Sequence, residues 1–172
     1  MRQDFEFNLF LYAFDPRNNF FGLFVKELPE ALIQNDSSKT ALLLHNLLSA
    51  IAPEQHEPNE KHYLAVMQAA FIAAGLEVLG QTPSSSDGKS DMSVFLKDIR
   101  FVMEVKYCKA DKKDADDKEK ADKDLESALD AATDQIRSKD YAAPFRVAGK
   151  TTAGVAIAVR GRNEVAVRFF EP

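Results

Sequence analysis

The segment FVMEVKY, residues 101–107, constrains the fold of this chain more than any other. Its alternation predicts a strand with Val102, Glu104 and Lys106 on one face and four apolar or aromatic residues on the other. The Cα atoms of Glu104 and Lys106 are then about 6.6 Å apart. Because a strand buried on both faces rarely carries an acid and a base, this strand is the first candidate for a functional site.

The preceding segment, SDMSVFL, predicts a second strand that forms a hairpin with the first. A two-residue turn at Lys97-Asp98 places Asp91 opposite Glu104. A two-residue turn at Asp98-Ile99 places Asp91 opposite Lys106 instead. In both registers the three side chains share one face, with facing Cβ atoms about 4.5–5.5 Å apart. A three-residue loop without a bulge reverses the parity and separates them.

Two carboxylates and one ammonium on a small area of sheet suit a particular chemistry. Carboxylates held this close repel each other unless a cation lies between them. Oxygen ligands favour Mg²⁺ or Mn²⁺, and a nearby lysine can orient a water and stabilise charge on a phosphate. The pattern therefore suits metal-assisted hydrolysis of a phosphodiester. A structural cluster of ion pairs near a sheet edge is the alternative, and the spacing leaves it open.

Hydrophobic periodicity predicts the remaining elements. We expect helices over 20–33, 41–51, 60–74 and 125–139, and strands over 76–79, 92–96, 101–107, 153–159 and 164–169. Asn59 and Gly75 fit the start and end of the third helix. The charged block 109–123 is expected to be a solvated loop or the start of a helix. From residue 60 on, the order predicts an α/β sandwich around one mixed sheet, with residues 1–58 as a helical N-terminal extension and linker and 59–172 as the main domain.

Charge and cysteine content exclude several classes of protein. Asp and Glu number 27 against 22 Lys and Arg, giving a net charge of −5, so histone-like binding over the whole surface is not expected. The single cysteine, Cys108, excludes a disulfide framework and a cysteine-based zinc site. The start MRQDFEF is not a signal peptide, which favours the cytoplasm. The longest apolar stretch, 41–52, is too short to span a membrane.

These motifs resemble those of the PD-(D/E)xK nuclease superfamily, whose fold is restriction-endonuclease-like. Asp91 is followed after twelve residues by Glu104-Val105-Lys106. The surrounding order is similar to the nuclease-like domain behind an AAA-type ATPase module in many bacterial proteins. That family shows Gly-Arg-x-Asp, Glu-x-Lys and a Gln-Ile pair followed by a Tyr, and its counterparts here are Gly88-Lys89-Ser90-Asp91, Glu104-Val105-Lys106, and Gln135-Ile136 with Tyr141. The resemblance covers about residues 59–170, and the Phe-rich N-terminal segment is similar to the joining segment of that family.

The resemblance implies an Mg²⁺- or Mn²⁺-dependent nuclease that acts by attack of a metal-activated water, with DNA, ahead of RNA, as the expected substrate. Asp91, Glu104 and the backbone carbonyl of Val105 would bind the metal, and Lys106 would position the water or stabilise the phosphate. Glu60 would contact the metal through a water molecule. An acid that simply stabilises the first turn of its helix is an equally good explanation of this residue. Gln135 would face the site, or else would be a polar helix residue bonded to backbone. Tyr141 is expected to be a core or helix-end aromatic.

The chain also departs from that family. Lys89 replaces the usual Arg, and the charged block after Lys106 is longer than the usual connection. The nucleotide-binding pattern G-x-x-x-x-G-K-[ST] is missing, because Pro83 stands where SSSDGKS would need its first Gly. We therefore expect either a stand-alone nuclease domain or the C-terminal piece of a longer protein. The alternatives are a catalytically silent binding module and a nuclease gated by an ATPase or other partner that docks on the Phe-rich segment.

Other polar residues carry weaker expectations. His62 is expected at the surface and His45 in the core. Cys108 lacks the His and acid that a nucleophile needs. Phosphate contacts near the sheet are assigned to four basic residues, with ordinary surface charge as the alternative: Lys89, Arg160, Arg162 and Arg168.

Overall fold

The computed structural model describes residues 19–51, 57–83, 88–110, 117–146 and 150–172. In chain order its elements are α2 (Asn19–Ile33), α3 (Ser37–Ser49), α4 (Glu60–Ala73), β1 (Glu77–Pro83), β2 (Lys89–Leu96), β3 (Ile99–Cys108), α5 (Lys118–Ser138), a 3₁₀ turn η3 (Ala143–Phe145), β4 (Thr151–Arg160) and β5 (Glu164–Phe170). The predicted succession of helices and strands is confirmed.

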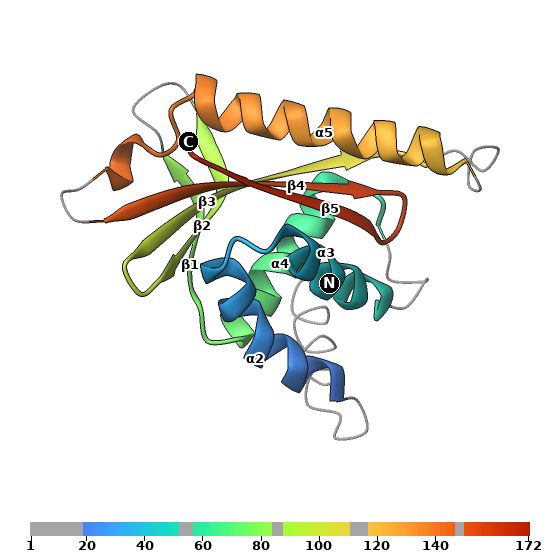
Figure 1. Ribbon diagram of the computed structural model, residues 1–172, viewed down its shortest axis with the longest axis horizontal. Coiled ribbons are helices and arrows are strands. Elements are labelled where there is room, and N and C mark those ends of the chain that lie inside the picture. Colours follow the sequence, from blue (N-terminus) through green and yellow to red (C-terminus); the bar gives the residue numbers. More distant parts are fainter. Residues whose placement is uncertain (1–18, 52–56, 84–87, 111–116, 147–149) are drawn as a thin grey trace.

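The five strands form one mixed sheet in the order β1-β2-β3-β4-β5. Neighbouring strands are antiparallel except β3 and β4, which are parallel. Parallel neighbours need a crossover connection, and α5 supplies it between β3 and β4 (Figure 1). This arrangement confirms the predicted α/β class with a mixed central sheet and helices in the N-terminal part.

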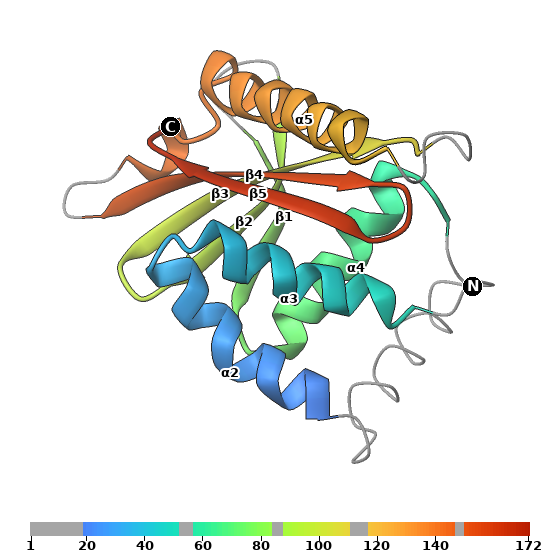
Figure 2. The same ribbon diagram turned by 45° about the vertical axis from the view of Figure 1, so that its right-hand side comes forward.

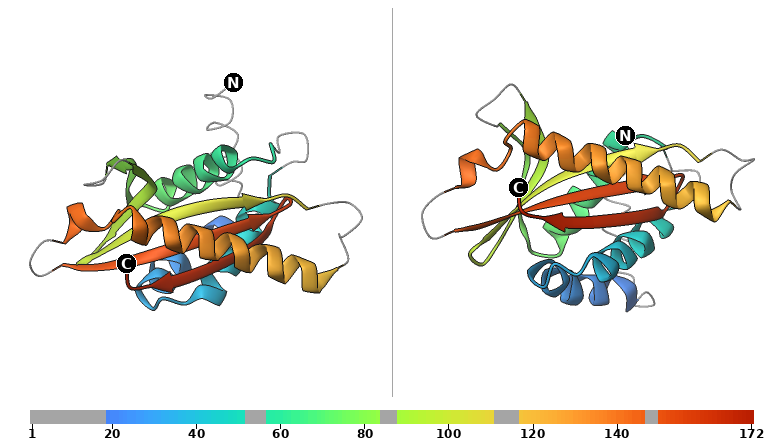
Figure 3. Two further views of the ribbon diagram at one scale, coloured as in Figure 1. Left: turned by 90° about the horizontal axis from the view of Figure 1, so that it is seen from above. Right: turned by 45° about the horizontal axis from the view of Figure 1, so that its top comes forward.

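Helices cover both faces of the sheet. The long α5 lies along one face, and α2, α3 and α4 lie against the other (Figures 1 and 2). Seen from above, α5 runs along the strands β4 and β5 over much of their length (Figure 3). The layers therefore place β3, which carries the candidate residues, in the middle of the sheet and under helices on both sides.

The two faces of β3 have different packing partners. Phe101, Met103 and Val105 belong to the main core, with apolar residues of α2, α3 and α4. On the opposite face of the sheet, Ala156 and Ala158 of β4 contact Leu129 and Ala132 of α5, while Val102 contacts Ile136. Small residues at this second interface allow α5 to lie close to the sheet.

The helices α2 and α3 share the main core with the rest of the protein. Phe21, Phe24 and Leu28 are buried there. The proposed division at residues 58 and 59, and docking of a partner on the Phe-rich segment, stay predictions because much of that segment lies outside the described residues. No helix in the described ranges is long and apolar enough to cross a membrane.

Element boundaries differ from the prediction in several places. α3 begins at Ser37, before the predicted start at 41, where the Asp36 side chain accepts a hydrogen bond from the Lys39 amide at 2.9 Å. α5 begins at Lys118, within the charged block, where the Asp117 side chain accepts a hydrogen bond from the Lys120 amide at 3.0 Å. Its first turns have no apolar stripe, so periodicity alone could not reveal them. β1 continues to Pro83 and β2 begins at Lys89, so both strands extend beyond the predicted ranges 76–79 and 92–96.

Candidate active site

The hairpin of β2 and β3 brings the predicted acids together. Leu96 pairs with Ile99, so the turn is Lys97-Asp98, the first of the two registers expected from the sequence. The pairing runs to Met92 opposite Met103, and the next step along both strands leads to Asp91 and Glu104. The convergence of the acids on one face therefore holds.

The site lies where the pairing of β2 with β3 ends. Beyond Met103, β3 continues to Cys108 with β4 as its paired neighbour. In place of a further rung of the ladder, the Val105 amide donates a hydrogen bond of 2.8 Å to Oδ2 of Asp91. Burial raises the pKa of the Asp91 carboxyl above its usual value, although the Val105 N–H and the Lys106 charge oppose this shift.

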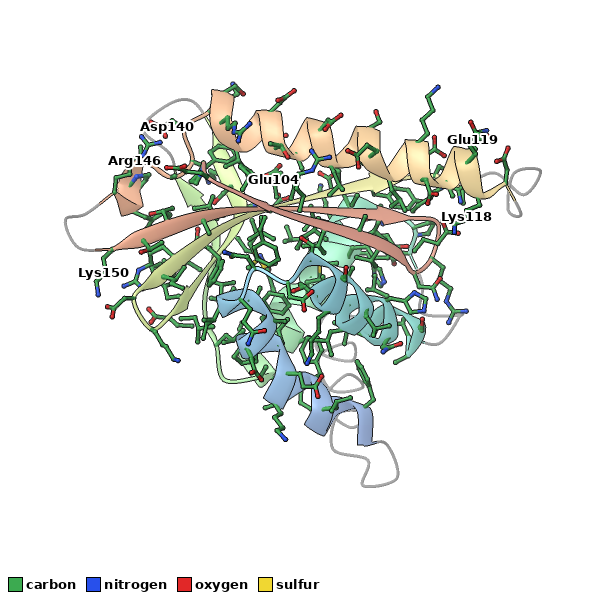
Figure 4. All side chains as sticks on the ribbon, viewed as in Figure 1. Glu104, Lys118, Glu119, Asp140, Arg146 and Lys150 are labelled. Carbon is green, nitrogen blue, oxygen red and sulfur yellow. The ribbon has the colours of Figure 1, made fainter. Side chains whose placement is uncertain are left out.

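Glu104 is the most deeply buried charged group of the site. Its exposed fraction is 1%, and Figure 4 shows it in the central part of the molecule. Its Oε1 atom accepts a hydrogen bond from Nζ of Lys106 at 2.9 Å. Its Oε2 atom is buried and has no hydrogen-bond partner among the described residues. Burial, and then the charge of Asp91, raise the pKa of Glu104 to about 7, although Lys106 and the Asp91 backbone N–H oppose this shift.

Lys106 links Glu104 to the beginning of α4. Its Nζ atom lies 3.6 Å from Oε1 of Glu60, in addition to its contact with Glu104. Burial lowers the pKa of Lys106, but the hydrogen bond to Glu104 and the nearby carboxylates outweigh burial, and the net shift is upward. The lysine therefore stays charged at neutral pH and faces two acids.

Glu60 reaches the site from the first turn of α4. The Asn59 side chain caps this helix by accepting a hydrogen bond from the His62 amide at 2.9 Å. Glu60 is therefore both at a helix start, where acids are favoured, and beside Lys106. A favourable position at a helix start and a position close enough to contribute to the site, the two alternatives for Glu60, are therefore compatible.

Among the described residues, Gln135 forms a side-chain hydrogen bond with Tyr141 and none with Asp91, Glu104 or Lys106. Its Nε2 atom lies 3.2 Å from the Tyr141 hydroxyl. Tyr141 is buried against Val102, as expected for a core aromatic. A Cβ atom on Gly88 would be 3.1 Å from that hydroxyl, so glycine lets the loop before Asp91 approach closely. A catalytic role for Gln135 stays a prediction.

The donor set fits a hard divalent cation. An unpartnered buried carboxylate oxygen is costly without a compensating charge, and Oε2 of Glu104 is such an atom. Asp91, Glu104 and the Val105 carbonyl would supply oxygen ligands of the kind that Mg²⁺ and Mn²⁺ prefer. No group of three His, Cys, Asp or Glu side chains suitable for a metal occurs in the described part of the chain. The carbonyl and water would have to complete the coordination.

The basic residues expected to contact phosphate are largely occupied within the protein. Arg160 is fully buried and forms ion pairs of 3.1 Å with Asp124 and 2.9 Å with Glu164. The prediction that it contacts phosphate is wrong, because the guanidinium neutralises these two acids instead. Arg168 pairs with Asp130 at 2.7 Å and with Glu126, and Arg162 donates to the Ile51 carbonyl. Lys89 remains exposed.

Three further residues are placed by the structure. His45 lies at an intermediate depth, where Nδ1 contacts the Asn163 carbonyl at 2.8 Å. His62 was expected at the surface but is only partly exposed, and its Nε2 atom is buried. Burial raises the pKa of Cys108, which is consistent with the expectation that it is no nucleophile.

Sequence reasoning missed Gln68 of α4. Its side-chain amide donates a hydrogen bond of 3.1 Å to the backbone carbonyl of Asp91. Gln68 lies next to the buried residue Met67 in the sequence. A polar residue bordering an apolar helix stripe is common, so the sequence contained no specific signal for this contact.

Comparison with known proteins identifies one family. Residues 58–169 match the family model described as PD-(D/E)XK nuclease superfamily. No curated protein and no solved structure matches the chain at a significant level. The matched range begins before α4 and ends in β5, so it contains every residue of the candidate site.

Proposed function

Because the chain belongs to the PD-(D/E)XK nuclease superfamily, we propose that it is a metal-dependent nuclease that hydrolyses DNA phosphodiester bonds. The observation that carries this proposal is the buried, unpartnered Oε2 atom of Glu104 beside Asp91 and Lys106. In folded proteins the large majority of buried polar side-chain atoms have a hydrogen-bond partner, so a buried carboxylate oxygen in this state calls for a compensating charge. A cation between the two acids would compensate both charges.

Each residue has a distinct task in this proposal. Asp91 and Glu104, with the Val105 carbonyl, would hold Mg²⁺ or Mn²⁺. The bound cation would supply Lewis acidity and lower the pKa of a water molecule. Lys106, held 2.9 Å from Glu104, would orient the attacking water and offset negative charge developing on the phosphate. Glu60 would keep the ammonium of Lys106 in place from the other side.

The reaction consumes one water for each bond. The water oxygen bonds to phosphorus while the bond from phosphorus to the leaving sugar oxygen breaks, and that oxygen takes up a proton. No covalent intermediate with the protein is required. Uncatalysed hydrolysis of phosphate esters is extremely slow, and enzymes accelerate the slowest such reactions by ~10¹⁷-fold or more.

A catalytically silent binding module is the second candidate, and one observation favours it. Oε1 of Glu104 is already engaged by Lys106, and the described residues contain no third side-chain ligand of the usual kinds. A module that binds nucleic acid or a partner without cleavage would keep this ion pair as a structural feature.

Cleavage of plasmid and single-stranded DNA with Mg²⁺ or Mn²⁺ tests the proposal. Asp91→Asn and Lys106→Met remove the two charges with little change in volume. Asp134→Asn and Lys26→Met are matched controls, because both residues are exposed and lie outside the site. We expect metal-dependent cleavage by the wild type and both controls, and a loss of about 10²–10⁴-fold in Lys106→Met. Equal background in all five proteins would support the silent module.

A further inference from the structure

The β1–β2 ladder is interrupted at Asp91. The register runs from Gly80 opposite Met92 to Thr82 opposite Ser90, and the intervening pair of Gln81 and Asp91 is skipped. Gln81 has a φ angle of +48°, in the left-handed region that non-glycine residues rarely adopt. Such a conformation costs on the order of 1–3 kcal/mol and persists where the surrounding structure imposes it.

Gln68 supplies a hydrogen-bond donor at this break. Its Nε2 atom lies 3.1 Å from the Asp91 carbonyl oxygen. Gly80, on the neighbouring strand, provides the space, because a Cβ atom there would lie 3.1 Å from the same Nε2 atom. The helix α4 thus replaces a missing rung of the sheet with a side-chain amide.

Asp91 is therefore fixed at two points. Gln68 holds its backbone carbonyl, and the Val105 amide holds its carboxylate at 2.8 Å. Neither contact is part of a regular strand ladder. Loss of the first contact leaves a part-buried carbonyl without this donor and frees the peptide plane to rotate, which moves the carboxylate away from Val105.

We propose that Gln68 is a positioning residue that holds Asp91 in the orientation required to bind the metal together with Glu104. This inference rests on the proposed nuclease function and assigns to α4 a role beyond the delivery of Glu60. Residues that orient metal ligands from outside the coordination sphere typically change metal affinity 10–100-fold when removed.

Gln68→Met removes the donor and keeps the length of the side chain. Gln34→Met is the matched control, because Gln34 is exposed on the α2 side and bonds only to Glu30 among the described contacts. Gly80→Val is a second test, since it leaves Gln68 in place but takes the space of its amide.

The first readout needs no metal. In metal-free protein, we expect the Val105 amide to exchange its hydrogen at least about tenfold faster in Gln68→Met than in the wild type, with the amides of β4 unchanged. The second readout is Mn²⁺ affinity by calorimetry, which should fall about 10–100-fold in Gln68→Met. Excess Mn²⁺ should restore kcat, and the KM for DNA should stay the same.

The two hypotheses fail in different ways. Wild-type Val105 exchange and wild-type Mn²⁺ affinity in both Gln68→Met and Gly80→Val would overturn the role of Gln68, whatever the cleavage result. If Val105 exchanges faster in Gln68→Met but the wild type neither binds Mn²⁺ nor cleaves DNA, Gln68 still orders Asp91. The proposed link to metal binding is then overturned. Faster exchange in β4 as well would indicate general destabilisation and would also overturn the proposal.

Discussion

Glu104 combines a deeply buried position with a charge that burial disfavours. Its pKa is raised to about 7, first by desolvation and then by Asp91. Lys106 offsets only part of this cost, since it contacts one carboxylate oxygen and leaves the other buried. The metal-free protein is therefore less stable with Glu104 ionised than with a neutral group at this position.

Glu104→Gln is expected to stabilise the metal-free protein at high pH. The folded-state pKa is about 7 and the reference value is 4.5. Below pH 4.5 both states are protonated and the carboxyl has no effect. As the pH rises from 4.5 through 7, the unfolded state loses the proton first, so the wild type loses up to about 3 kcal/mol. Above pH 7 this loss is constant.

Thermal unfolding in EDTA between pH 5 and pH 8 measures this difference. The Tm of Glu104→Gln should be close to that of the wild type at pH 5 and several degrees higher at pH 8. Asp134→Asn, on the exposed face of α5, controls for the loss of one negative charge. Parallel Tm curves for wild type and Glu104→Gln would contradict the ionisation assigned to Glu104.

At the scale of elements, the alternation of side chains along the two strands predicted which residues share a face. The sequence of the turn did not predict which two residues form it. Any two-residue turn places Asp91, Glu104 and Lys106 on one face, so the sequence predicts the convergence for two-residue turns, whereas a three-residue loop without a bulge would reverse it. The choice of Lys97-Asp98 requires a φ of +54° at Lys97, which nothing in a lysine favours. The contacts from Val105 and Gln68 to Asp91 depend on where the strand ladders stop. That property belongs to the packed sheet and was outside the reach of periodicity.

The start of α4 can be tested as an element. Asn59→Ala removes the side-chain oxygen that caps the His62 amide. The loss should lower the free energy of unfolding by about 0.5–2 kcal/mol, or the Tm by about 2–4 °C per kcal/mol. It should also loosen Glu60 and reduce its contact with Lys106.

Asn59→Ser is the control for this variant, because serine caps helices about as well as asparagine. Its Tm should remain near that of the wild type. Equal Tm values for Asn59→Ala and Asn59→Ser would show that the cap does not stabilise α4.

At the scale of the whole molecule, charge balance directs how a polyanion can bind. The net charge is −5. Arg160 and Arg168 of the sheet are already paired with Asp124 and Asp130 of α5. The exposed part of α5 adds Glu119 and Asp134 to the surface. On the proposed function, DNA would therefore need local positive charge at the site, which Lys106 and a bound cation would provide.

The same cation should stabilise the entire fold. A ligand that binds only the folded state adds about 2.7 kcal/mol when its concentration is 100 times its Kd. For a chain of this size that corresponds to a Tm increase of about 5–11 °C. We expect this increase for the wild type with Mn²⁺ and none for Asp91→Asn, whose site lacks one ligand charge.

Ionic strength must be matched in this experiment, because Mn²⁺ also screens the repulsion within an acidic protein. A monovalent salt of equal ionic strength supplies that control, and Asp134→Asn supplies the control for a lost surface charge. An equal Tm increase in Asp91→Asn would mean that Mn²⁺ acts on the general acidic surface. The pair Asp91 and Glu104 would then be a structural feature of a silent module, since a cation held between them must stabilise the wild type more than the variant.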